Sequence, residues 1–393
     1  MPQLAKYKEC TGCMACVDSC NHNALNVSLN EEGHIVPLID KNKCVSCGLC
    51  EKVCPVVAKL PYSESPKAEA FAAWAKDKVV RMNSATAGAF SAMAQYVLSQ
   101  GGVACGASNV DGTHVRHICI EDINELYKLQ GSKYTQSNAE GIYRTVCNYL
   151  KQDRLVLFSG TGCQVAGLYG FLGKRKYKGR LITIDLICGG VPSRLLIDKF
   201  IEGEPYQVKE IVSFRTKEHG WAPHGFKYNL KVMDVDGNIH DYTNKRNLIS
   251  TGFACEMTNR YSCYRCKFAG THRMSDFTIG DYWGVSDFKQ QHYEGVSAVI
   301  AHSNESIAFL DEVNKYLEVH SADLSDIVAH NKRICICKDN SYMLPERRYL
   351  TYAFQHFNYD NLKAIYAYAF SKYSPWMIYK ICRTIAKKIV NRL

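Results

Sequence analysis

Eight cysteines within the first 54 residues constrain this chain more than any other feature. They form two runs, "CTGCMACVDSC" and "CVSCGLCEKVCP", and in each run three thiols recur at every third residue before a fourth follows. A loop with this spacing can direct several thiolates toward one inorganic centre, whereas a disulfide framework has no need of such regularity. The segment is also too short to bury a large apolar core. We therefore expect it to hold two 4Fe–4S clusters.

The spacing is that of the bacterial two-cluster ferredoxins, in which the fourth cysteine of each run binds the cluster of the other run. This rule assigns the first cluster to Cys10, Cys13, Cys16 and Cys54, and the second cluster to Cys20, Cys44, Cys47 and Cys50. Pro55 follows Cys54 as the pattern requires, whereas Asn21 stands where the first run would carry proline. Paired disulfides and two structural zinc sites are the alternatives, and the repeat favours iron–sulfur over both.

A chain of 393 residues is longer than a ferredoxin needs, so further domains are expected after the cysteine-rich segment. We predict a ferredoxin-type domain at 1–58, a linker at 59–69, a larger body at 70–335 and a helical tail at 336–393. In the body, strand patterns alternate with helical ones, so the predicted fold class is α+β or α/β with a mixed sheet. Hairpins are expected to turn at Asp111–Gly112 and at Asp236–Gly237.

The formal charge of +10 counts every cysteine as neutral. An oxidised four-iron core with four thiolates contributes about −2, so two or three clusters remove roughly 4 to 6 units of positive charge. The charge therefore gives no reason to expect a nucleic-acid partner. No apolar run is long enough to cross a bilayer. The odd number of 19 cysteines and the lack of an apolar N-terminal signal fit a reducing cytoplasm, which is the predicted location.

The C-terminal segment "SPWMIYKICRTIAKKIVNRL" is predicted to be a helix with an apolar and a basic face. Such a helix can lie on a membrane surface as a peripheral contact. Packing on its own domain is the favoured interpretation, because surface helices are routinely amphipathic.

Two segments of the body have a strand–loop–helix pattern, and each carries a cysteine just after its strand. Cys163 lies in "RLVLFSGTGCQVAGLYGFL" and Cys188 in "GRLITIDLICGGVPSRLLIDKF". If the two strands are parallel, both thiols lie at the carboxyl edge of the sheet, where open α/β sheets bind ligands. The helix that follows favours thiolate over thiol at its N-terminus. Glycines beside these cysteines leave room for a backbone or a cofactor to approach, namely Gly160, Gly162, Gly189 and Gly190.

A further pair, Cys263 and Cys266, forms a lone C-x2-C in "YSCYRCKF". Zinc, a redox disulfide and a cluster all remain open for this pair. With Cys163 and Cys188 it provides four candidate ligands for a third 4Fe–4S cluster. The other seven cysteines, which include Cys255, Cys335 and Cys337, are expected to be small buried apolar residues.

The sequence resembles the beta subunits of coenzyme F420-reducing hydrogenase and of the related formate dehydrogenase. The matching stretches are "GSKYTQS", "FSGTGCQVAGL", "DLICGGVPS", "SCYRCKF", "SDFTIGDYWG" and "GVSAVIAHS". The resemblance implies a body that binds FAD and a third 4Fe–4S cluster at Cys163, Cys188, Cys263 and Cys266. Where the family has a Ser- and Gly-rich turn, this chain reads "NSATAGAFSAM", with Ala87 in place of a second glycine. The use of the deazaflavin F420 as substrate does not follow from the fold.

The candidate flavin contacts come from these stretches. They are Ser84, Thr86, Gly88, Lys133, Tyr134, Gly160, Gly162, Asp281 and Trp283. Lys133 suits an anionic phosphate, although an exposed loop lysine is the ordinary alternative. Asp281 and Trp283 suit a turn beside a planar ring, although a buried core aromatic is the commoner case. No catalytic residue is assigned.

These features predict an iron–sulfur flavoprotein oxidoreductase. Electrons would pass between a ferredoxin-type or other one-electron carrier and an organic substrate or deazaflavin, through 4Fe–4S clusters and FAD. The alternatives are a non-catalytic electron-relay subunit of a larger redox complex, with a partner redox subunit, and a redox sensor. No G-x-G-x-x-G opens a βαβ unit, which disfavours a nicotinamide cofactor as the hydride partner.

Overall fold

The structure is a computed structural model, and it describes residues 1–58, 68–218, 220–221, 230–242, 247–256, 258–331, 333–334 and 352–362. Most of the predicted linker and of the predicted tail lies outside these residues. The amphipathic helix expected at the C-terminus lies outside them entirely. No helix in the described ranges is long and apolar enough to span a membrane.

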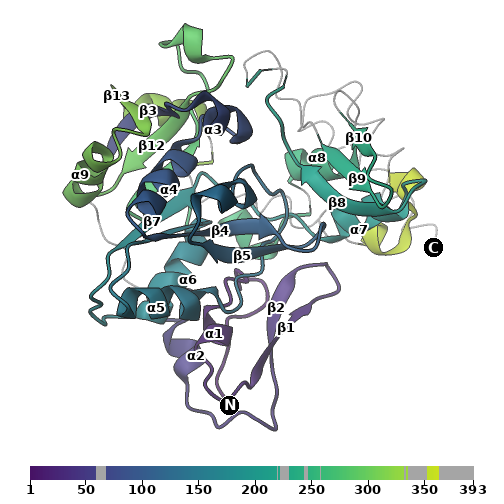
Figure 1. Cartoon of the computed structure of the whole chain (residues 1–393). Coiled ribbons are helices and arrows are strands. Elements are labelled where there is room, and N and C mark those ends of the chain that lie inside the picture. The colour runs from purple at the N-terminus through teal and green to yellow at the C-terminus, as the bar shows by residue number, and fades with distance from the viewer. Residues whose placement is uncertain are drawn as a thin grey trace.

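A mixed sheet forms the centre of the body (Figure 1). Among the described residues, eight strands build it in the order β13 (Leu317–Ala322), β3 (Glu69–Ala75), β12 (Ser297–Ala301), β11 (Phe277–Asp281), β7 (Leu181–Leu186), β6 (Val156–Gly160), β4 (Val103–Asn109) and β5 (Val115–Ile120). The neighbours β4, β6, β7 and β11 are parallel, and the outer pairs are antiparallel. The predicted mixed α/β class is confirmed.

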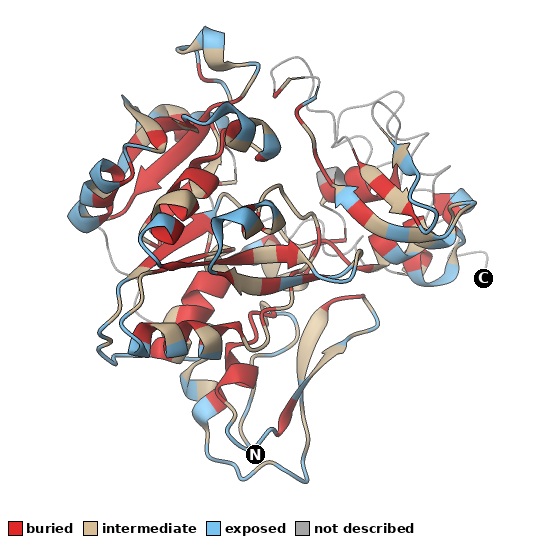
Figure 2. Ribbon diagram, viewed as in Figure 1, coloured by how far each residue is buried: buried red, intermediate tan, exposed pale blue. Residues whose placement is uncertain are grey.

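Helices cover both faces of this sheet. Packed against one face are α4 (Ala89–Ser99), α9 (Asn304–Glu312) and the 3-10 helix η1 (Ile123–Lys128). The other face carries α5 (Ile142–Lys151) and α6 (Gly162–Leu172). The parallel strands consist largely of buried residues, as Figure 2 shows, because helices cover both of their faces. Near the β3 end of the sheet lie α3 (Lys78–Asn83), α10 (Leu324–His330) and the short η3 (Lys289–Gln291).

The N-terminal module lies below α5 and α6 in Figure 1. It contains α1 (Ala15–Asp18), α2 (Leu49–Lys52) and a hairpin of β1 (Leu25–Leu29) with β2 (Ile35–Ile39). Met14, Ala15 and Val17 share one apolar cluster with residues of α5 and α6. The Asp18 carboxylate accepts the backbone N–H groups of Gly141 and Tyr143 at 2.6 and 2.9 Å. The module is therefore packed firmly on the body.

A second, smaller sheet stands beside the large one. It consists of β8 (Val208–Ser213), β9 (Lys231–Asp234) and β10 (Ile239–Asp241), all antiparallel. It shares an apolar cluster with α7 (Leu195–Glu202) and α8 (Leu248–Cys255). Residues 352–362 contribute Phe354 and Leu362 to the same cluster, so this part of the predicted tail packs on the smaller sheet and its helices.

The local predictions for strands and turns hold. Gly112 turns between β4 and β5, and Gly237 turns between β9 and β10, each with positive φ.

The expectation for the remaining seven cysteines is only partly met. Cys147 is buried, but Cys105 and Cys119 form a disulfide across β4 and β5, with their Cα atoms 4.1 Å apart. The strand register places these two residues opposite one another. Cys335 and Cys337 lie outside the described residues, as does the side chain of Cys255.

Candidate functional site

The structure places thiols from both cysteine runs of the N-terminal module close to one another. The Cys13 and Cys16 thiols both interact electrostatically with Cys10 and Cys54. Cys54 therefore lies near the first run, and Cys16 also interacts with Cys50 of the second run. The second set, which consists of Cys20, Cys44, Cys47 and Cys50, lines one small hollow together with apolar residues of β1 and β2.

Burial makes four of these thiols poor acids when no cluster is bound. The pKa values of Cys13 and Cys16 are raised first by loss of water and further by the neighbouring thiols. The same first cause raises the pKa values of Cys50 and Cys54. A bound metal centre deprotonates its thiol ligands and supplies the missing positive charge. Buried thiols gathered in this way are therefore suited to a cluster.

A third set of thiols gathers at the carboxyl edge of the large sheet. Cys163 lies in the first turn of α6, Cys188 follows β7, and Cys263 and Cys266 lie in and just after the 3-10 helix η2 (Tyr261–Arg265). All four interact electrostatically with one another. The Gly190 and Val191 N–H groups donate to the Cys188 and Cys263 sulfurs, each at 3.4 Å.

Cys163 does not show the thiolate preference expected at the α6 N-terminus when no cluster is bound. Burial raises the pKa of Cys163 to about 11, and the hydrogen bond with Thr161 only partly offsets this. Burial likewise raises the pKa of the Cys266 thiol to about 12. Desolvation is the stronger effect because the helix dipole contributes at most about 2 kcal/mol.

Within the described part of the chain, no group of three or more His, Cys, Asp or Glu side chains is close enough to hold a single metal ion.

The first and third thiol sets are neighbours. Cys13 interacts electrostatically with Cys163, and a Cβ atom added at Gly167 of α6 would lie 3.0 Å from the Cys13 sulfur. The Tyr143 hydroxyl donates to the Cys13 carbonyl at 2.7 Å and also contacts the Gln164 carbonyl of α6. The module thus presents its first thiol set directly to the helix that carries Cys163.

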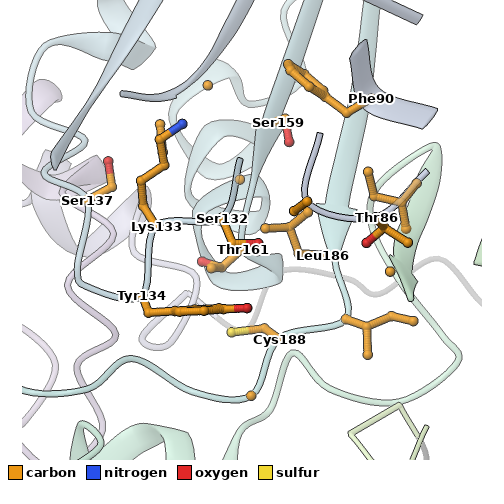
Figure 3. Close-up of a pocket in the computed structure, with 18 of the residues that line it drawn as sticks. Thr86, Phe90, Ser132, Lys133, Tyr134, Ser137, Ser159, Thr161, Leu186 and Cys188 are labelled. Atoms are coloured by element: carbon orange, nitrogen blue, oxygen red, sulfur yellow. The ribbon is translucent and has the colours of Figure 1, made fainter. Parts of the chain in front are cut away.

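A cavity of about 790 Å³ opens at the same edge of the sheet, where β6, β7 and β11 end (Figure 3). Cys163 and Cys188 line it, as do Thr11 and Gly12 of the N-terminal module. All the predicted flavin contacts except one are in its lining: Ser84, Thr86, Gly88, Lys133, Tyr134, Gly160, Asp281 and Trp283. The exception is Gly162, where an added Cβ would lie 2.9 Å from the Phe268 carbonyl oxygen. Its lack of a side chain serves helix packing.

The N-termini of two helices reach this cavity, and they differ in how they are capped. At α6 a capping box of Thr161 and Gln164 occupies free N–H groups. At α4 the N-cap is Gly88 with a φ of 83°, and no side chain caps the helix. Ala89, Phe90 and Ser91 of its first turn line the cavity. The uncapped end of an 11-residue helix offers N–H groups and a positive dipole to an anion such as phosphate.

Asp281, at the end of β11, organises one wall of the cavity. Its carboxylate accepts two hydrogen bonds from the Arg215 guanidinium, both at 3.0 Å. It also accepts the Trp221 indole N–H at 2.6 Å and the Thr86 hydroxyl at 2.9 Å. Burial alone would lower the pKa of Arg215, but the Asp281 carboxylate outweighs burial and raises it. The rings of Trp221 and Trp283 stack 5.1 Å apart beside this pair.

A buried lysine fixes the loop before α4. The Lys217 ammonium donates to the carbonyls of Arg81, Thr86 and Glu294. Burial lowers its pKa to about 7. This anchor and the Thr86–Asp281 hydrogen bond hold the 84–88 loop, and hence the α4 N-terminus, in place.

The opposite wall contains Lys133 and Tyr134 (Figure 3). The Lys133 ammonium donates to the carbonyls of Lys128 and Gln130 at 3.3 and 2.7 Å. Burial lowers its pKa to about 7. Lys133 therefore secures the end of η1 rather than lying exposed. The Tyr134 ring stacks on Phe253, with ring centroids 4.0 Å apart.

Several lining residues were not identified from the sequence. Arg215 and Phe253 are distant in the chain from any motif, and their roles depend on tertiary packing. His117 has no metal-binding spacing, yet it is buried and contacts the Ser137 hydroxyl and the Ser159 carbonyl at 2.8 and 3.1 Å. Strand alternation in "HVRHICI" could have placed His117 on a buried face, because Val115 two residues earlier shares that face.

Three family models match parts of the chain. Two of them describe the beta subunit of coenzyme F420 hydrogenase/dehydrogenase: its N-terminal part matches residues 70–142, and its C-terminal part matches residues 153–325. Together they span more than half of the 393 residues. The third, described as a 4Fe-4S dicluster domain, matches residues 9–58.

Among solved structures, one similar chain belongs to the F420-reducing NiFe hydrogenase complex from Methanosarcina barkeri. The two chains are 18% identical with a TM-score of 0.45, and the match covers 72% of this chain and 92% of the other. No curated protein sequence matches the chain.

Proposed function

This chain belongs to the coenzyme F420 hydrogenase/dehydrogenase beta-subunit family, and we propose that it is an iron–sulfur flavoprotein oxidoreductase. It would pass electrons between a one-electron carrier and an organic substrate or deazaflavin. One observation carries this proposal. The first thiol set lies next to Cys163, and Cys163 in turn lines the cavity, so a continuous path leads from the N-terminal module to the cavity.

Three 4Fe–4S clusters would occupy the three thiol sets. The first would be held by Cys10, Cys13, Cys16 and Cys54, the second by Cys20, Cys44, Cys47 and Cys50, and the third by Cys163, Cys188, Cys263 and Cys266. The dicluster family match supports the first two. Support for the third comes from the mutual interaction of its buried thiols and from the two N–H groups directed at their sulfurs.

FAD would occupy the cavity. Its volume falls within the range of cofactor sites, which is roughly 300–1,000 Å³. The uncapped N-terminus of α4 would receive the diphosphate, and the 84–88 loop would be held for it by Lys217 and Asp281. Gly88 and Gly160 allow close packing of the cavity wall, since an added Cβ would lie 2.9 Å from Ala75 Cβ at Gly88 and 3.2 Å from Gln164 at Gly160. Bound FAD supplies the conversion between one-electron and hydride chemistry.

The exposed end of the N-terminal module would receive the carrier. Cys47 is the exposed member of the second thiol set, and Val45 and Leu49 beside it are also exposed. This set would exchange electrons with a ferredoxin-type protein, and the first set would connect it to the body. The proposed location is the cytoplasm.

Reoxidation kinetics test the enzyme assignment. We expect the chemically reduced holoprotein to be reoxidised much faster by a deazaflavin or a specific organic substrate than by NAD⁺ or NADP⁺. Stopped-flow measurement of flavin absorbance follows this directly. Faster reoxidation by a nicotinamide cofactor would contradict the assignment.

A non-catalytic electron-relay subunit is the second candidate, and the family descriptions favour it in one respect because they name a subunit. A relay would copurify with a partner chain and show little turnover alone. An enzyme would turn over as the isolated chain with a reduced carrier and substrate.

A further inference from the structure

Arg260 is a fully buried cation at the junction of the N-terminal module and the body. Its exposed fraction is 0%. The guanidinium Nε donates to the Cys10 carbonyl at 2.7 Å, and Nη1 donates to the Ile35 carbonyl at 2.8 Å and to the Gln136 amide oxygen at 3.3 Å. Nη2 lies 3.7 Å from the Cys10 sulfur and points its N–H toward it. No carboxylate in the described ranges forms an ion pair with it.

A buried charge without a counter-charge is costly, because neutral carbonyls replace water only in part. Among the described groups that interact with the Arg260 guanidinium, those that can become anionic are thiols. Cys10 of the first set is in hydrogen-bond contact, and Arg260 also acts electrostatically on Cys163 of the third set. Cys263 is joined to it through the backbone, since its N–H donates to the Arg260 carbonyl at 2.9 Å. The guanidinium thus lies between the two sets.

The surrounding backbone is shaped to keep the guanidinium there. At Gly12, where φ is 68°, an added Cβ would lie 2.8 Å from Nη1 of Arg260. The Arg260 N–H donates to the Val191 carbonyl at 2.9 Å, which ties it to the loop after Cys188. Any shift of Arg260 would therefore disturb loops of both thiol sets.

We propose that Arg260 is a positioning residue whose charge compensates the first and third clusters and raises their reduction potentials. The proposal rests on the proposed function, because it requires clusters at these two thiol sets. A reduced cluster carries one more negative charge than an oxidised one, so a fixed cation in a dry site stabilises the reduced form preferentially. Two adjacent anionic centres would otherwise repel one another, and Arg260 reduces that repulsion.

The test is a redox titration followed by electron paramagnetic resonance on the whole holoprotein. In Arg260→Met, we expect the equilibrium constant for reduction of the first cluster to fall at least tenfold, which is about 59 mV for one electron. The third cluster should shift in the same direction. The second cluster serves as an internal reference, because the described contacts of Arg260 do not include its thiols. Arg260→Lys keeps the charge and should stay close to the wild-type potentials.

Arg144 offers a matched control at the same junction. It donates to the Asp18 and Cys20 carbonyls at 2.5 and 2.7 Å, but its described contacts include no thiol. Arg144→Met should therefore leave the potentials of the first and third clusters unchanged, although it also removes hydrogen bonds between module and body.

Each outcome decides the role of Arg260. Unchanged potentials in iron-loaded Arg260→Met would overturn the proposal. If this variant does not load iron, loading and wild-type potentials in Arg260→Lys support a role for the charge, whereas a tenfold shift in Arg260→Lys overturns it. An iron content near that of two clusters in the wild type would remove the third cluster and hence that part of the proposed function. The shift of the first cluster would still decide the role of Arg260.

Discussion

Gly88→Ala tests whether the N-terminus of α4 binds the cofactor. Gly88 has a φ of 83°, and the added Cβ would lie 2.9 Å from Ala75 Cβ and 3.4 Å from Arg81 Cα. The left-handed backbone alone costs about 1–2 kcal/mol. The contact with Ala75 cannot be relieved by rotating a side chain, so the first turn of α4 must move. Losing one charge-assisted hydrogen bond to a phosphate would cost about 1.5–3 kcal/mol, and the Kd for FAD would rise about 10- to 150-fold.

The assay is titration of the deflavinated protein with FAD, followed by quenching of flavin fluorescence. Gly101→Ala is the matched control, because Gly101 also has a positive φ, of 68°, but has nothing within 4 Å of an added Cβ. It follows the other end of α4 and should lower stability without changing the Kd. The reasoning would be refuted if Gly88→Ala bound FAD within twofold of the wild type.

Three further variants probe other parts of the site. Asp281→Asn should lower the free energy of unfolding by about 3–5 kcal/mol, because it leaves Arg215 as a buried cation without its carboxylate, and urea unfolding would show this as a lower midpoint. Cys263→Ala should reduce the iron content from about twelve to about eight atoms while the resonance spectrum of the N-terminal pair persists, whereas buried Cys147→Ala should lose no iron. Burial lowers the pKa of His117 from 6.5 to about 4, so the unfolded state takes up a proton that the folded state excludes between these values. The melting temperature should therefore fall as the pH drops from 6.5 toward 4, and His117→Gln should make that slope shallower; an equal slope in both proteins would contradict this.

The parts of the site that depend on local pattern were predictable. The spacing of the first eight cysteines predicts both thiol sets, including the crossing of Cys54 to the first run. The strand–loop–helix patterns place Cys163 and Cys188 at one edge on the condition that β6 and β7 are parallel, and the structure shows that they are. These inferences succeed because short-range geometry determines where a residue after a buried strand must lie.

The remaining features depend on contacts between distant segments. Arg260 contacts Cys10, which is 250 residues away in the sequence. No periodic pattern in the sequence predicts a contact between residues so far apart. The disulfide of Cys105 with Cys119 depends on the register of β4 and β5, which the sequence leaves open. Lys133 lies in the lining of the cavity, but its anchoring of η1 follows from burial of its ammonium. Burial also reverses the expected acidity of Cys163, because desolvation depends on the completed fold.

Cofactor analysis of the protein purified without oxygen tests most directly whether three clusters and a flavin share one continuous path through this chain. Iron, acid-labile sulfide and flavin are measured per chain on the same sample. We expect about twelve irons, about twelve sulfides and about one FAD. About eight irons without flavin would contradict the path into the cavity, and tightly bound zinc with little iron would contradict the iron–sulfur assignment as a whole.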